Sequence, residues 1–510
     1  MGGALLAGCN SVSTPPPEIA LPLAYSSAKG SSHGDLPSQS RWWLTFGDAQ
    51  LNGLIDRGLS TNLDIRQAYQ RLAAANASLR RAGADARPQL SVEGGYSGYG
   101  SHAAGSHDLG TRGTGSLTFN LGVDLFGRYA NERKAAAARQ AAAAANVQVV
   151  RLAYLADLTA SYIDLQYFRQ ALFVANQNIA SYRKTLELTR DMRTAGIATN
   201  LDVAQAQALV DAARAELPLF YKGADAAAHR IATLLDQPAT GFVNSLSKKR
   251  HQPQPSGKAS VLTAGVPADL LRNRPDVRRE EFLLTAAAAE IGVAQAQLYP
   301  ALSLTGNIDA STILATGNPV SAAVWAFGPS LLAPILDGGR LRANVDIAKA
   351  DTRGQYLVWR QSVLKAVEEV ETALAAVRRS QQQVQAYRQV VSSYAKASKL
   401  ARESYRGGTG IILDVLASER SLSEGRLALA DSLRQLGKDY VSLQVAIGGG
   451  AAVTGALESL TTGSTGHIAV SSPVKLPALP ARDAKAADKP VQAKKESGQA
   501  IAPLRLKRAG

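Results

Sequence analysis

The sequence predicts an α+β protein built from two copies of one unit, each with a β-hairpin and a long helical hairpin. Three observations predict this fold class. Residues 64–235 recur in residues 276–447 at a constant spacing of 212 positions. Residues 117–125 alternate between apolar and polar side chains, which is the pattern of a strand with one apolar face. Residues 128–195 contain neither Gly nor Pro, so a continuous helix there would reach about 100 Å.

The duplication is visible in short matching motifs. Pro88-Gln89-Leu90-Ser91-Val92 recurs as Pro300-Ala301-Leu302-Ser303-Leu304, and Gly127-Arg128 recurs as Gly339-Arg340. A common register over so many residues indicates that one structural unit has been used twice. Each unit is too long to be a solenoid repeat.

The composition favours long packed helices and gives no sign of nucleic-acid binding. Aromatic residues make up only 6% of the 510 residues, and the formal net charge is +15. Residues 451–510 hold nine Lys or Arg against four Asp or Glu and so contribute +5. A nucleic-acid-binding protein would gather its basic residues on one face among aromatic side chains, and the sequence has no such patch. We expect no nucleic-acid partner, and we interpret most charges as solvated helix faces.

The N-terminal segment contains the single cysteine of the chain, in Leu5-Leu6-Ala7-Gly8-Cys9-Asn10. A short apolar run that ends in small residues is typical of a signal-peptide cleavage region. Leu-Ala-Gly-Cys also resembles a bacterial lipobox, in which the cysteine becomes the lipidated first residue of the mature protein. The alternative is a chance cysteine in an apolar segment.

We therefore predict a residual signal peptide at 1–8 and a lipid anchor with an extended segment at 9–40. The apolar run is short and no basic region precedes it, so Met1 would be a wrong start or the result of a truncation. Asn10 follows the cysteine where Asp would imply retention at the inner membrane, so the lipobox resemblance implies the outer membrane.

The first repeat is predicted to span 41–238. Its opening helices end before Pro88, because proline disfavours helix in the residue before it. A β-hairpin follows at about 88–127, with a Gly/Ser/His-rich linking loop around 102–113. A long helical hairpin then occupies about 128–238.

The second repeat is predicted to span 266–450 with the same plan. A helix from Asp276 to Tyr299 precedes a β-hairpin at about 300–338, whose linking loop is expected near 316–319. The return strand is expected to carry Trp325, Phe327, Leu331 and Ile335 on its apolar side. A helical hairpin follows at about 339–448.

Two further segments lie outside the repeats. Residues 239–265 are predicted to be a linker. Residues 451–510 mix Pro, Ala and Lys without periodicity and are predicted to form a disordered basic tail.

The predicted strands cannot form a closed membrane structure within one chain. Two hairpins supply four strands, whereas about eight is the smallest number observed in a membrane barrel. In lipid, an open sheet edge leaves unpaired N–H and C=O groups that cost several kcal/mol each. If the strands lie in a membrane, several chains must share one barrel, and the alternative is a soluble β-sheet.

Long motifs stand at the start of both repeats: Trp42-Trp43 with Phe46-Gly47-Asp48 in the first, and Val266-Pro267-Ala268-Asp269-Leu270-Leu271-Arg272-Asn273-Arg274-Pro275-Asp276-Val277-Arg278 in the second, followed by Ile291-Gly292-Val293-Ala294 and Leu298-Tyr299-Pro300. The motifs at the start of both repeats resemble those of TolC-like outer-membrane efflux channels of the NodT/OprM lipoprotein branch. The resemblance covers about residues 10–450 and includes the duplication.

The resemblance implies a homotrimer whose chains give four strands each to a 12-stranded β-barrel, continued by a coiled-coil barrel of helices across the periplasm. It implies docking on a periplasmic adaptor protein and an inner-membrane pump. The implied function is the passive exit duct of a tripartite RND-type efflux system for drugs or other small molecules, with no cofactor and no metal. The alternatives are a type I protein-secretion channel with the same fold and a periplasmic coiled-coil scaffold without a pore.

The same resemblance implies roles for individual residues. The helix turns Gly196-Ile197-Ala198-Thr199 and Gly408-Thr409-Gly410 match the adaptor-docking tips of the family, although glycine also suits any tight turn. Asp414 matches an acidic position that lines the periplasmic constriction, and Tyr405 matches a gate tyrosine. Three copies of Asp414 near one axis would repel one another and favour the passage of cations.

Alternatives to the gate roles remain open. Asp202 holds the place of Asp414 in the first repeat, and an Asp in the first turn of a helix is stabilised by the helix dipole. Simple packing would account for Tyr405. Ala417 stands where some relatives have a second acidic residue, and Gly410 where some have Arg, which speaks against a two-ring or an arginine-linked gate.

The sequence does not predict an enzyme. Its six His are scattered, and it has neither H-E-x-x-H nor a G-x-x-x-x-G-K-[ST] phosphate loop. His102 and His107 lie in a predicted loop, where we interpret them as surface residues rather than metal ligands.

Overall fold

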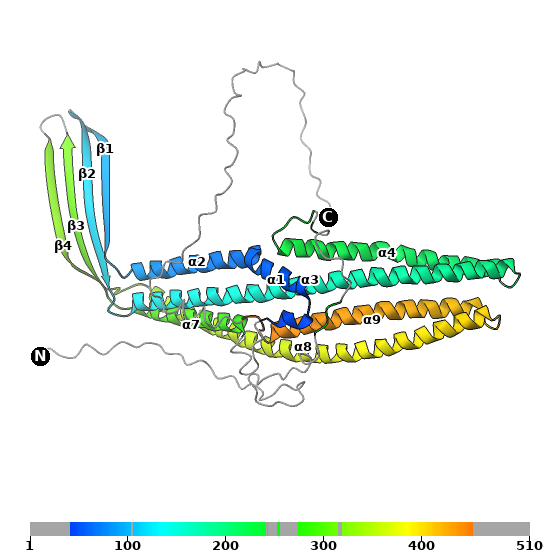
Figure 1. The fold of residues 1–510 in the computed structure, drawn as a ribbon. Helices are drawn as coiled ribbons and strands as arrows, with labels where there is room; N and C mark the ends of the chain where they lie inside the picture. Colours follow the sequence, from blue (N-terminus) through cyan, green and yellow to red (C-terminus); the bar gives the residue numbers. More distant parts are fainter. Residues whose placement is uncertain are drawn as a thin grey trace, which may run out of the picture. The chain divides into compact units, whose positions relative to one another are not determined.

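Each repeat folds into a pair of antiparallel helices and a β-hairpin, and the strands join the helices where α3 and α8 begin (Figure 1). The first repeat contains a 3₁₀ helix, η1 (Trp42–Phe46), then α1 (Ala49–Thr61), α2 (Leu63–Ala84), β1 (Gln89–Ala103), β2 (Ser106–Val123), α3 (Arg128–Thr194) and α4 (Asn200–Leu234). The second contains α7 (Pro275–Ala296), β3 (Ala301–Leu314), β4 (Val320–Leu332), α8 (Arg340–Arg406) and α9 (Ile412–Ala446).

The computed structural model describes residues 41–103, 106–240, 242, 252–255, 274–314 and 319–451. They all belong to one unit of the chain, Met1–Thr454, and a second unit comprises Gly455–Gly510. Cys9 and the predicted segments 1–8 and 9–40 lie outside the described residues. So do most of the linker 239–265 and the tail after Ala451. Within the linker, the Gln252 and Gln254 amides donate hydrogen bonds to α9 carbonyls at 2.8 and 3.0 Å.

The longest helices, α3 and α8, have 67 residues each, and the returning helices α4 and α9 have 35 each. A rise of 1.5 Å per residue makes α3 and α8 about 100 Å long. Helix α3 packs against α2, α4, α7 and α9, whereas α8 packs against α7 and α9. No helix among the described residues is long and apolar enough to cross a membrane.

Small and aromatic side chains hold the helices together. The early part of α3 buries Ala135, Ala138, Ala142 and Ala145, whose small side chains let neighbouring helices approach closely. An aromatic cluster joins the N-terminal η1 to the end of the second repeat. There the indole Nε1 of Trp42 donates to the carbonyl of Gly449 at 3.1 Å, and Phe46 meets Tyr440 edge to face.

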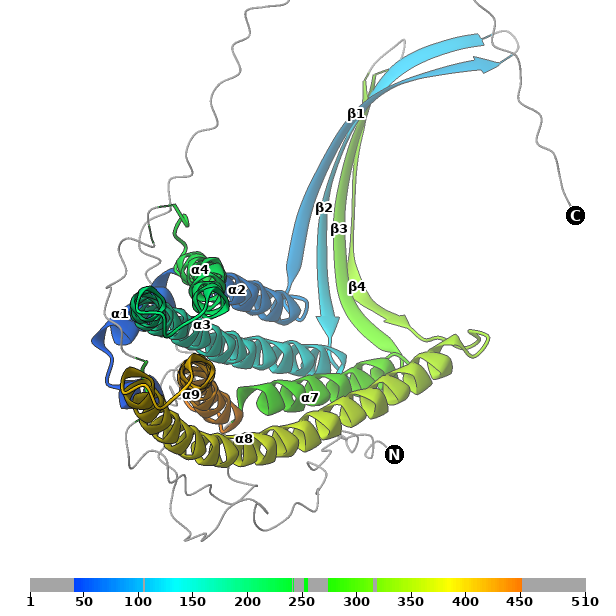
Figure 2. The ribbon, with the colours of Figure 1, turned by 90° about the vertical axis from the view of Figure 1, so that its right-hand side faces the viewer.

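The four strands form one antiparallel sheet in the order β1-β2-β3-β4 and curve together (Figure 2). Its register places residues of like polarity opposite one another. One row across the sheet is Val92, Leu117, Ile308 and Trp325. The next row, which points to the other face, is Ser91, Thr118, Asn307 and Ala326. Across β1, β2 and β3 the sheet therefore has an apolar and a polar face, which confirms the alternation predicted from residues 117–125. The second face of β4 differs, because it carries Val320, Val324 and Leu332.

The hairpins differ from the prediction at two places. Residues 106–113, predicted as part of a loop, belong to β2 and pair with β1 along their whole length, and residues 111–113 also pair with β3. The sequence of this segment lacks the alternation of apolar and polar residues from which strands are recognised. Backbone pairing does not require that alternation, so the strand could not be predicted there. In the second hairpin β4 ends at Leu332, so Ile335 lies beyond the strand.

Candidate functional site

The turn between α3 and α4 is a tight and exposed end of the first helical hairpin. Gly196 has a positive φ of 76°, a conformation that glycine adopts without steric cost. The N–H groups of Ile197 and Ala198 both donate to the carbonyl of Met192, at 2.9 and 3.2 Å. Ile197 nevertheless keeps 65% of its surface exposed, so the turn presents an apolar side chain to the surroundings.

The turn between α8 and α9 repeats this geometry. Gly408, which is the counterpart of Gly196, has a φ of 74°. The N–H groups of Thr409 and Gly410 both donate to the carbonyl of Ser404, at 3.0 and 3.1 Å. Gly410 leaves little room for a side chain, because an added Cβ would lie 3.0 Å from Cβ of Ser404. Both predicted tips are therefore short, hydrogen-bonded turns with equivalent backbones.

The structure separates Asp202 from Asp414, which the sequence alone could not distinguish. Asp202 forms a capping box: its Oδ2 accepts from the N–H of Thr199 at 2.7 Å, and the Thr199 hydroxyl accepts from the N–H of Asp202 at 3.2 Å. Asp414 lies in the first turn of α9, but the N-cap there is Ile411, whose side chain cannot accept a hydrogen bond. Asp414 is exposed, so it retains the helix-dipole stabilisation without the capping role.

Tyr405 is buried at the end of α8, with 6% of its surface exposed. It packs in an apolar cluster with Tyr182 and Leu186 of α3 and Val415 of α9. Burial raises the pKa of the Tyr405 hydroxyl above its ordinary value, and the hydroxyl of Thr189 opposes this shift to a smaller extent. Tyr405 thus links the two helical hairpins close to their tips, while Asp414 is exposed.

A buried ionic network near the same end was not predicted from the sequence. Glu419 of α9 has a side chain only 1% exposed, and its Oε1 lies 2.7 Å from Nε of Arg402 on α8. The Thr185 hydroxyl donates to the same carboxylate at 2.8 Å, and Nη2 of Arg402 donates to the hydroxyl of Ser181 at 2.8 Å. This network fixes α8 and α9 against α3, and its partners are too far apart in the sequence to form a local signal.

Arg274 forms a second buried ionic link, at the start of α7. Its guanidinium lies 2.7 Å from Asp276 and 2.6 Å from Glu369 of α8, and it donates to the carbonyl of Ala446 in α9 at 2.8 Å. Arg274 belongs to the Arg-Pro-Asp-Val-Arg motif, which the sequence analysis used only as a family marker. The motif thus joins three helices of the second repeat.

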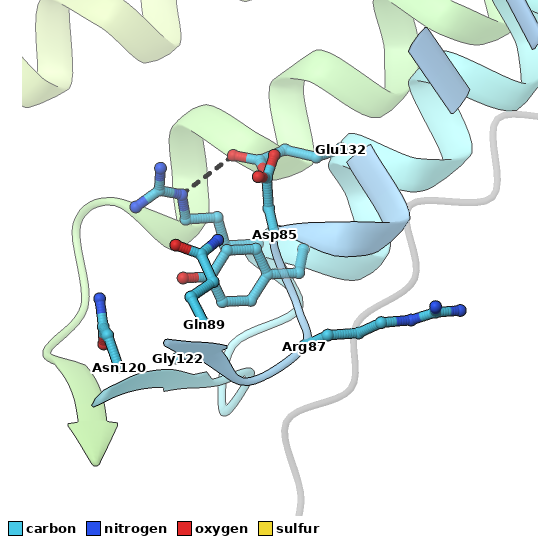
Figure 3. Close-up of a pocket in the computed structure, with 8 residues that line it drawn as sticks. Asp85, Arg87, Gln89, Asn120, Gly122 and Glu132 are labelled. Atoms are coloured by element: carbon cyan, nitrogen blue, oxygen red, sulfur yellow. Dashed lines mark hydrogen bonds and ion pairs between the residues drawn. The ribbon is translucent and has the colours of Figure 1, made fainter. Parts of the chain in front are cut away.

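A polar pocket of about 340 Å³ lies where the first hairpin meets α2 and α3 (Figure 3). Arg128 closes one side through an ion pair with Glu132 at 3.0 Å. Asp85 lies beside Glu132, and Arg87 is directed away from the pocket (Figure 3). Tyr129 fits against Gly122, where an added Cβ would lie 2.2 Å from the phenol oxygen. Side chains of both charges therefore line this pocket at the junction between the sheet and the helices.

Comparison with known proteins places both repeats in one family. The family model of outer membrane efflux proteins matches residues 54–237 and 266–449. The chain is 41% identical over 437 residues to Nodulation protein T of Rhizobium leguminosarum bv. viciae, which covers 85% of this chain and 89% of that protein. It is 30% identical over 414 residues to the cation efflux system protein CusC of Escherichia coli, which covers 81% of this chain and 89% of that protein.

A solved structure of the outer-membrane channel OprN has the same fold. It superposes with a TM-score of 0.74 at 28% identity, over 85% of this chain and 99% of that chain. The family match in each repeat, the relatives and the shared fold confirm the resemblance inferred from the motifs. The chain belongs to the outer membrane efflux protein family, as an outer-membrane efflux channel of the NodT/OprM type.

Proposed function

We propose that three copies of the chain form the passive exit duct of a tripartite RND-type efflux system in the outer membrane. The observation that carries this proposal is the sheet, one face of which carries large apolar side chains on all four strands. Trp325, Phe327 and Leu331 on this face are 76%, 66% and 66% exposed. Large apolar side chains in such a row are suited to lipid, and the polar face is suited to a water-filled lumen.

The two edges of the sheet support a ring of copies. Among the described strands, β1 pairs only with β2 and β4 pairs only with β3, so each leaves one row of backbone groups without a strand partner. In lipid such an edge costs several kcal/mol per unpaired group, and pairing between β4 and β1 of successive copies removes both edges at once. Three copies, the number implied by the resemblance to TolC-like channels, give a barrel of 12 strands.

The helical hairpins continue the duct toward the inner membrane. A component of this kind performs no chemistry; it offers a wet passage, and an inner-membrane pump supplies the energy. The equivalent turns at Gly196-Ile197-Ala198-Thr199 and Gly408-Thr409-Gly410 dock on a periplasmic adaptor protein. Their equivalent hydrogen-bonded backbones and the exposed side chain of Ile197 support this role.

Two further features complete the proposal. Asp414 from three copies forms an acidic ring at the periplasmic constriction, and Tyr405 holds the neighbouring helices in the closed arrangement. The exposure of Asp414 and the absence of a capping hydroxyl at Ile411 support a role beyond helix stabilisation. Cys9 carries the acyl chains that anchor the N-terminus in the outer membrane, as its lipobox-like setting suggests.

The test combines a physical and a cellular measurement. The protein purified in mild detergent should have the mass of a trimer and should conduct ions in a planar bilayer. A deletion strain should accumulate small compounds, and re-expression should reverse this only together with one of the candidate pumps. A monomer without conductance would indicate the pore-less scaffold, and loss of protein secretion without compound accumulation would indicate the type I channel.

A further inference from the structure

We propose that the second hairpin carries a two-part subsite for amphiphilic organic cations on its lumen-facing side. Ile313, Val320 and Val324 receive the apolar body of the molecule, and Asp309 receives its positive charge. The inference rests on the proposed duct, because it requires the sheet face opposite Trp325 to line water. It adds a place inside the barrel where one chemical class of cargo is held briefly before it leaves.

The four side chains of this subsite lie on one face of the sheet. Ile313 of β3 pairs with Val320 of β4, and Asp309 pairs with Val324. Directly opposite residues of an antiparallel pair point to the same side, and so do residues two or four positions apart along one strand. Trp325 follows Val324 directly and therefore points to the other side, which is the side proposed to meet lipid.

The subsite lies in the outer part of the sheet. Ile313 and Val320 form the last pair of the second hairpin within the described residues, beside the reversal of the chain. The helices join the strands at their opposite ends (Figure 1). Cargo that enters from the helical tube therefore meets these residues late in its passage.

The apolar part of the subsite is accessible. Val320 and Val324 are 64% and 62% exposed, and the small side chain of Ala322 between them is exposed as well. Ile313 is half-buried and borders Val320. Val320 and Val324 are about 13 Å apart along the strand. Apolar surface of this kind is unfavourable in water, so its coverage by an apolar molecule is favourable.

The first repeat has no such surface at the equivalent place. The counterparts of Asp309, Ile313, Val320 and Val324, 212 positions earlier, are Ser97, Ser101, Asp108 and Arg112. All four counterparts are polar or charged, which is usual for the inner face of a wide membrane barrel. The apolar surface is therefore a property of the second hairpin alone. Barrel formation does not account for it, whereas a ligand with an apolar body does.

Asp309 supplies a negative charge at the edge of the apolar surface. It is exposed, its carboxylate accepts a hydrogen bond from the amide of Asn307, and no Lys or Arg in the described part of the chain forms an ion pair with it. Glu93 lies in the same row of the sheet, since it pairs with Ser116 and Ser116 pairs with Asp309. The two carboxylates are therefore two strand spacings, or about 10 Å, apart, and both favour a cation.

Arg112 does not neutralise this charge. It lies on the same face in β2, opposite Ile313, which is about 13 Å from Asp309 along β3. The guanidinium of Arg112 lies over the ring of Tyr99 on β1, 5.9 Å from the ring centre. It is therefore directed away from β3 and from the carboxylate of Asp309.

The two parts together select a chemical class. A small inorganic cation gains nothing from the valines, and a neutral apolar molecule gains nothing from Asp309. Asp309 and Val324 are direct cross-strand neighbours whose Cβ atoms lie about 5 Å apart, so a molecule with its charge close to an apolar body meets both. Both contributions are weak at an exposed site, so the molecule is released again, as passage through a duct requires.

Protection of an introduced cysteine in outer-membrane preparations tests the subsite. In Ala322→Cys the thiol lies between Val320 and Val324 on the same face, and its reaction with N-ethylmaleimide is followed by mass tagging on a gel. Tetraphenylphosphonium should slow this reaction several-fold. Tetramethylammonium lacks the apolar body and naphthalenesulfonate has the opposite charge, so neither should slow it at the same concentration. Ala301→Cys, on the same face near the helices, is the matched control and should not be protected.

Variants in the Ala322→Cys background separate the two parts of the subsite. Asp309→Asn removes the charge and Val324→Asn removes apolar surface, so each should reduce the protection several-fold. Val324→Leu keeps the apolar surface and should retain the protection. Ala323→Cys, on the face proposed to meet lipid, tests the duct itself, because a thiol among acyl chains ionises poorly and should react several-fold more slowly.

The outcomes distinguish the subsite from the duct. Rapid reaction of Ala322→Cys without protection by tetraphenylphosphonium would overturn the subsite and leave the duct intact. So would equal protection of Ala301→Cys, protection by naphthalenesulfonate, or protection that survives Asp309→Asn. Reaction of Ala322→Cys and Ala301→Cys no faster than that of Ala323→Cys would overturn the lumen assignment and with it the proposed function. The unchanged protein reports any labelling of Cys9.

Discussion

Asn62 and Arg274 occupy the same position in the two repeats and make the same hydrogen bond. Nδ2 of Asn62 donates to the carbonyl of Leu234 at 3.0 Å, and Nη1 of Arg274 donates to the carbonyl of Ala446 at 2.8 Å. Leu234 and Ala446 are also 212 residues apart. Asn62 links the start of α2 to the end of α4, and Arg274 links the start of α7 to the end of α9. The first repeat uses a neutral amide for this purpose and the second uses a buried cation.

This difference predicts unequal costs of removal. Arg274→Ala leaves the partly exposed carboxylates of Asp276 and Glu369 without their cation and should destabilise the fold by about 3 kcal/mol, the lower end for a broken buried ion pair. Asn62→Ala removes a neutral bond and a cap and should cost about 1–2 kcal/mol. The Tm of the purified protein, followed by helical circular dichroism, should therefore fall further for Arg274→Ala. Equal shifts in the two variants would contradict the ionic role of Arg274.

The Arg274 link also predicts a dependence on acid. Burial alone would raise the pKa of Asp276, but the hydrogen bonds and positive charge of Arg274 outweigh it and hold this pKa below its ordinary value. A lowered pKa means that Asp276 stabilises the fold in full above the ordinary carboxyl pKa of about 3.9 and loses this contribution as the pH falls through the lowered value. In Asp276→Asn the drop in Tm between about pH 5 and pH 2 should be smaller than in the unchanged protein. An identical drop would exclude Asp276 as a source of acid sensitivity.

The two faces of the sheet predict opposite responses to a charge. Phe327→Arg places a guanidinium on the apolar face and should cost about 2–4 kcal/mol if this position lies near the middle of the bilayer. Ala326→Arg, one residue away on the opposite face, should have little effect if that face lines the proposed water-filled lumen. Outer-membrane fractions run on gels without heating should show loss of the oligomer only for Phe327→Arg. Equal loss in both variants would show that the apolar face does not meet lipid.

The separation of Asp414 from Asp202 predicts distinct effects on conduction. Asp414→Ala should reduce both the preference for cations and the cation conductance in a planar bilayer, because in the proposed trimer it removes three negative charges near the axis. Asp202→Ala should leave the cation preference unchanged and destabilise its helix by about 1 kcal/mol through loss of the capping box. Unchanged selectivity and conductance in Asp414→Ala would remove this residue from the constriction.

Two glycines of α1 predict changes of stability with opposite signs. An added Cβ at Gly58 would lie 1.5 Å from the phenol oxygen of Tyr154, so Gly58→Ala should destabilise the fold by about 1–3 kcal/mol through overpacking. Gly53 has no atom within 4 Å of such a Cβ. Gly53→Ala should therefore stabilise the helix by about 0.5–1 kcal/mol. Thermal unfolding of both variants measures the difference, and a loss of stability in Gly53→Ala would contradict the open space around that position.

The sequence predicted the elements that follow a strong local pattern. The long helices were recognisable because residues 128–195 contain no breaker, and the apolar face of β2 was recognisable from its alternation. The Gly-rich continuation at 106–113 was missed, because its pairing depends on neighbouring strands rather than on its own side chains. The constant spacing of 212 residues identified the equivalent positions of the two hairpins, and the sheet pairs these positions in the same register.

The candidate site was less accessible to sequence reasoning. Asp202 and Asp414 seemed equivalent because the difference between them lies in the N-cap residues Thr199 and Ile411. The link between Arg402 and Glu419 could not be inferred, because it is completed by hydroxyls of α3 more than 200 residues away. Buried ionic networks depend on which helices meet, and helix packing is not encoded in any short motif.

The unbroken spacing of the two hairpins restricts where the chain can change in length. A single residue inserted into any strand would exchange the side chains of the two sheet faces from that point on and would shift the pairing with the neighbouring strands. The hairpin ends, after Ala103 and after Leu314, lie beyond the last pairs of each hairpin in the described part of the sheet, so an insertion there shifts none of those pairs. Peptide tags, receptor epitopes and natural length variation should therefore be tolerated at these two ends and rejected within the strands.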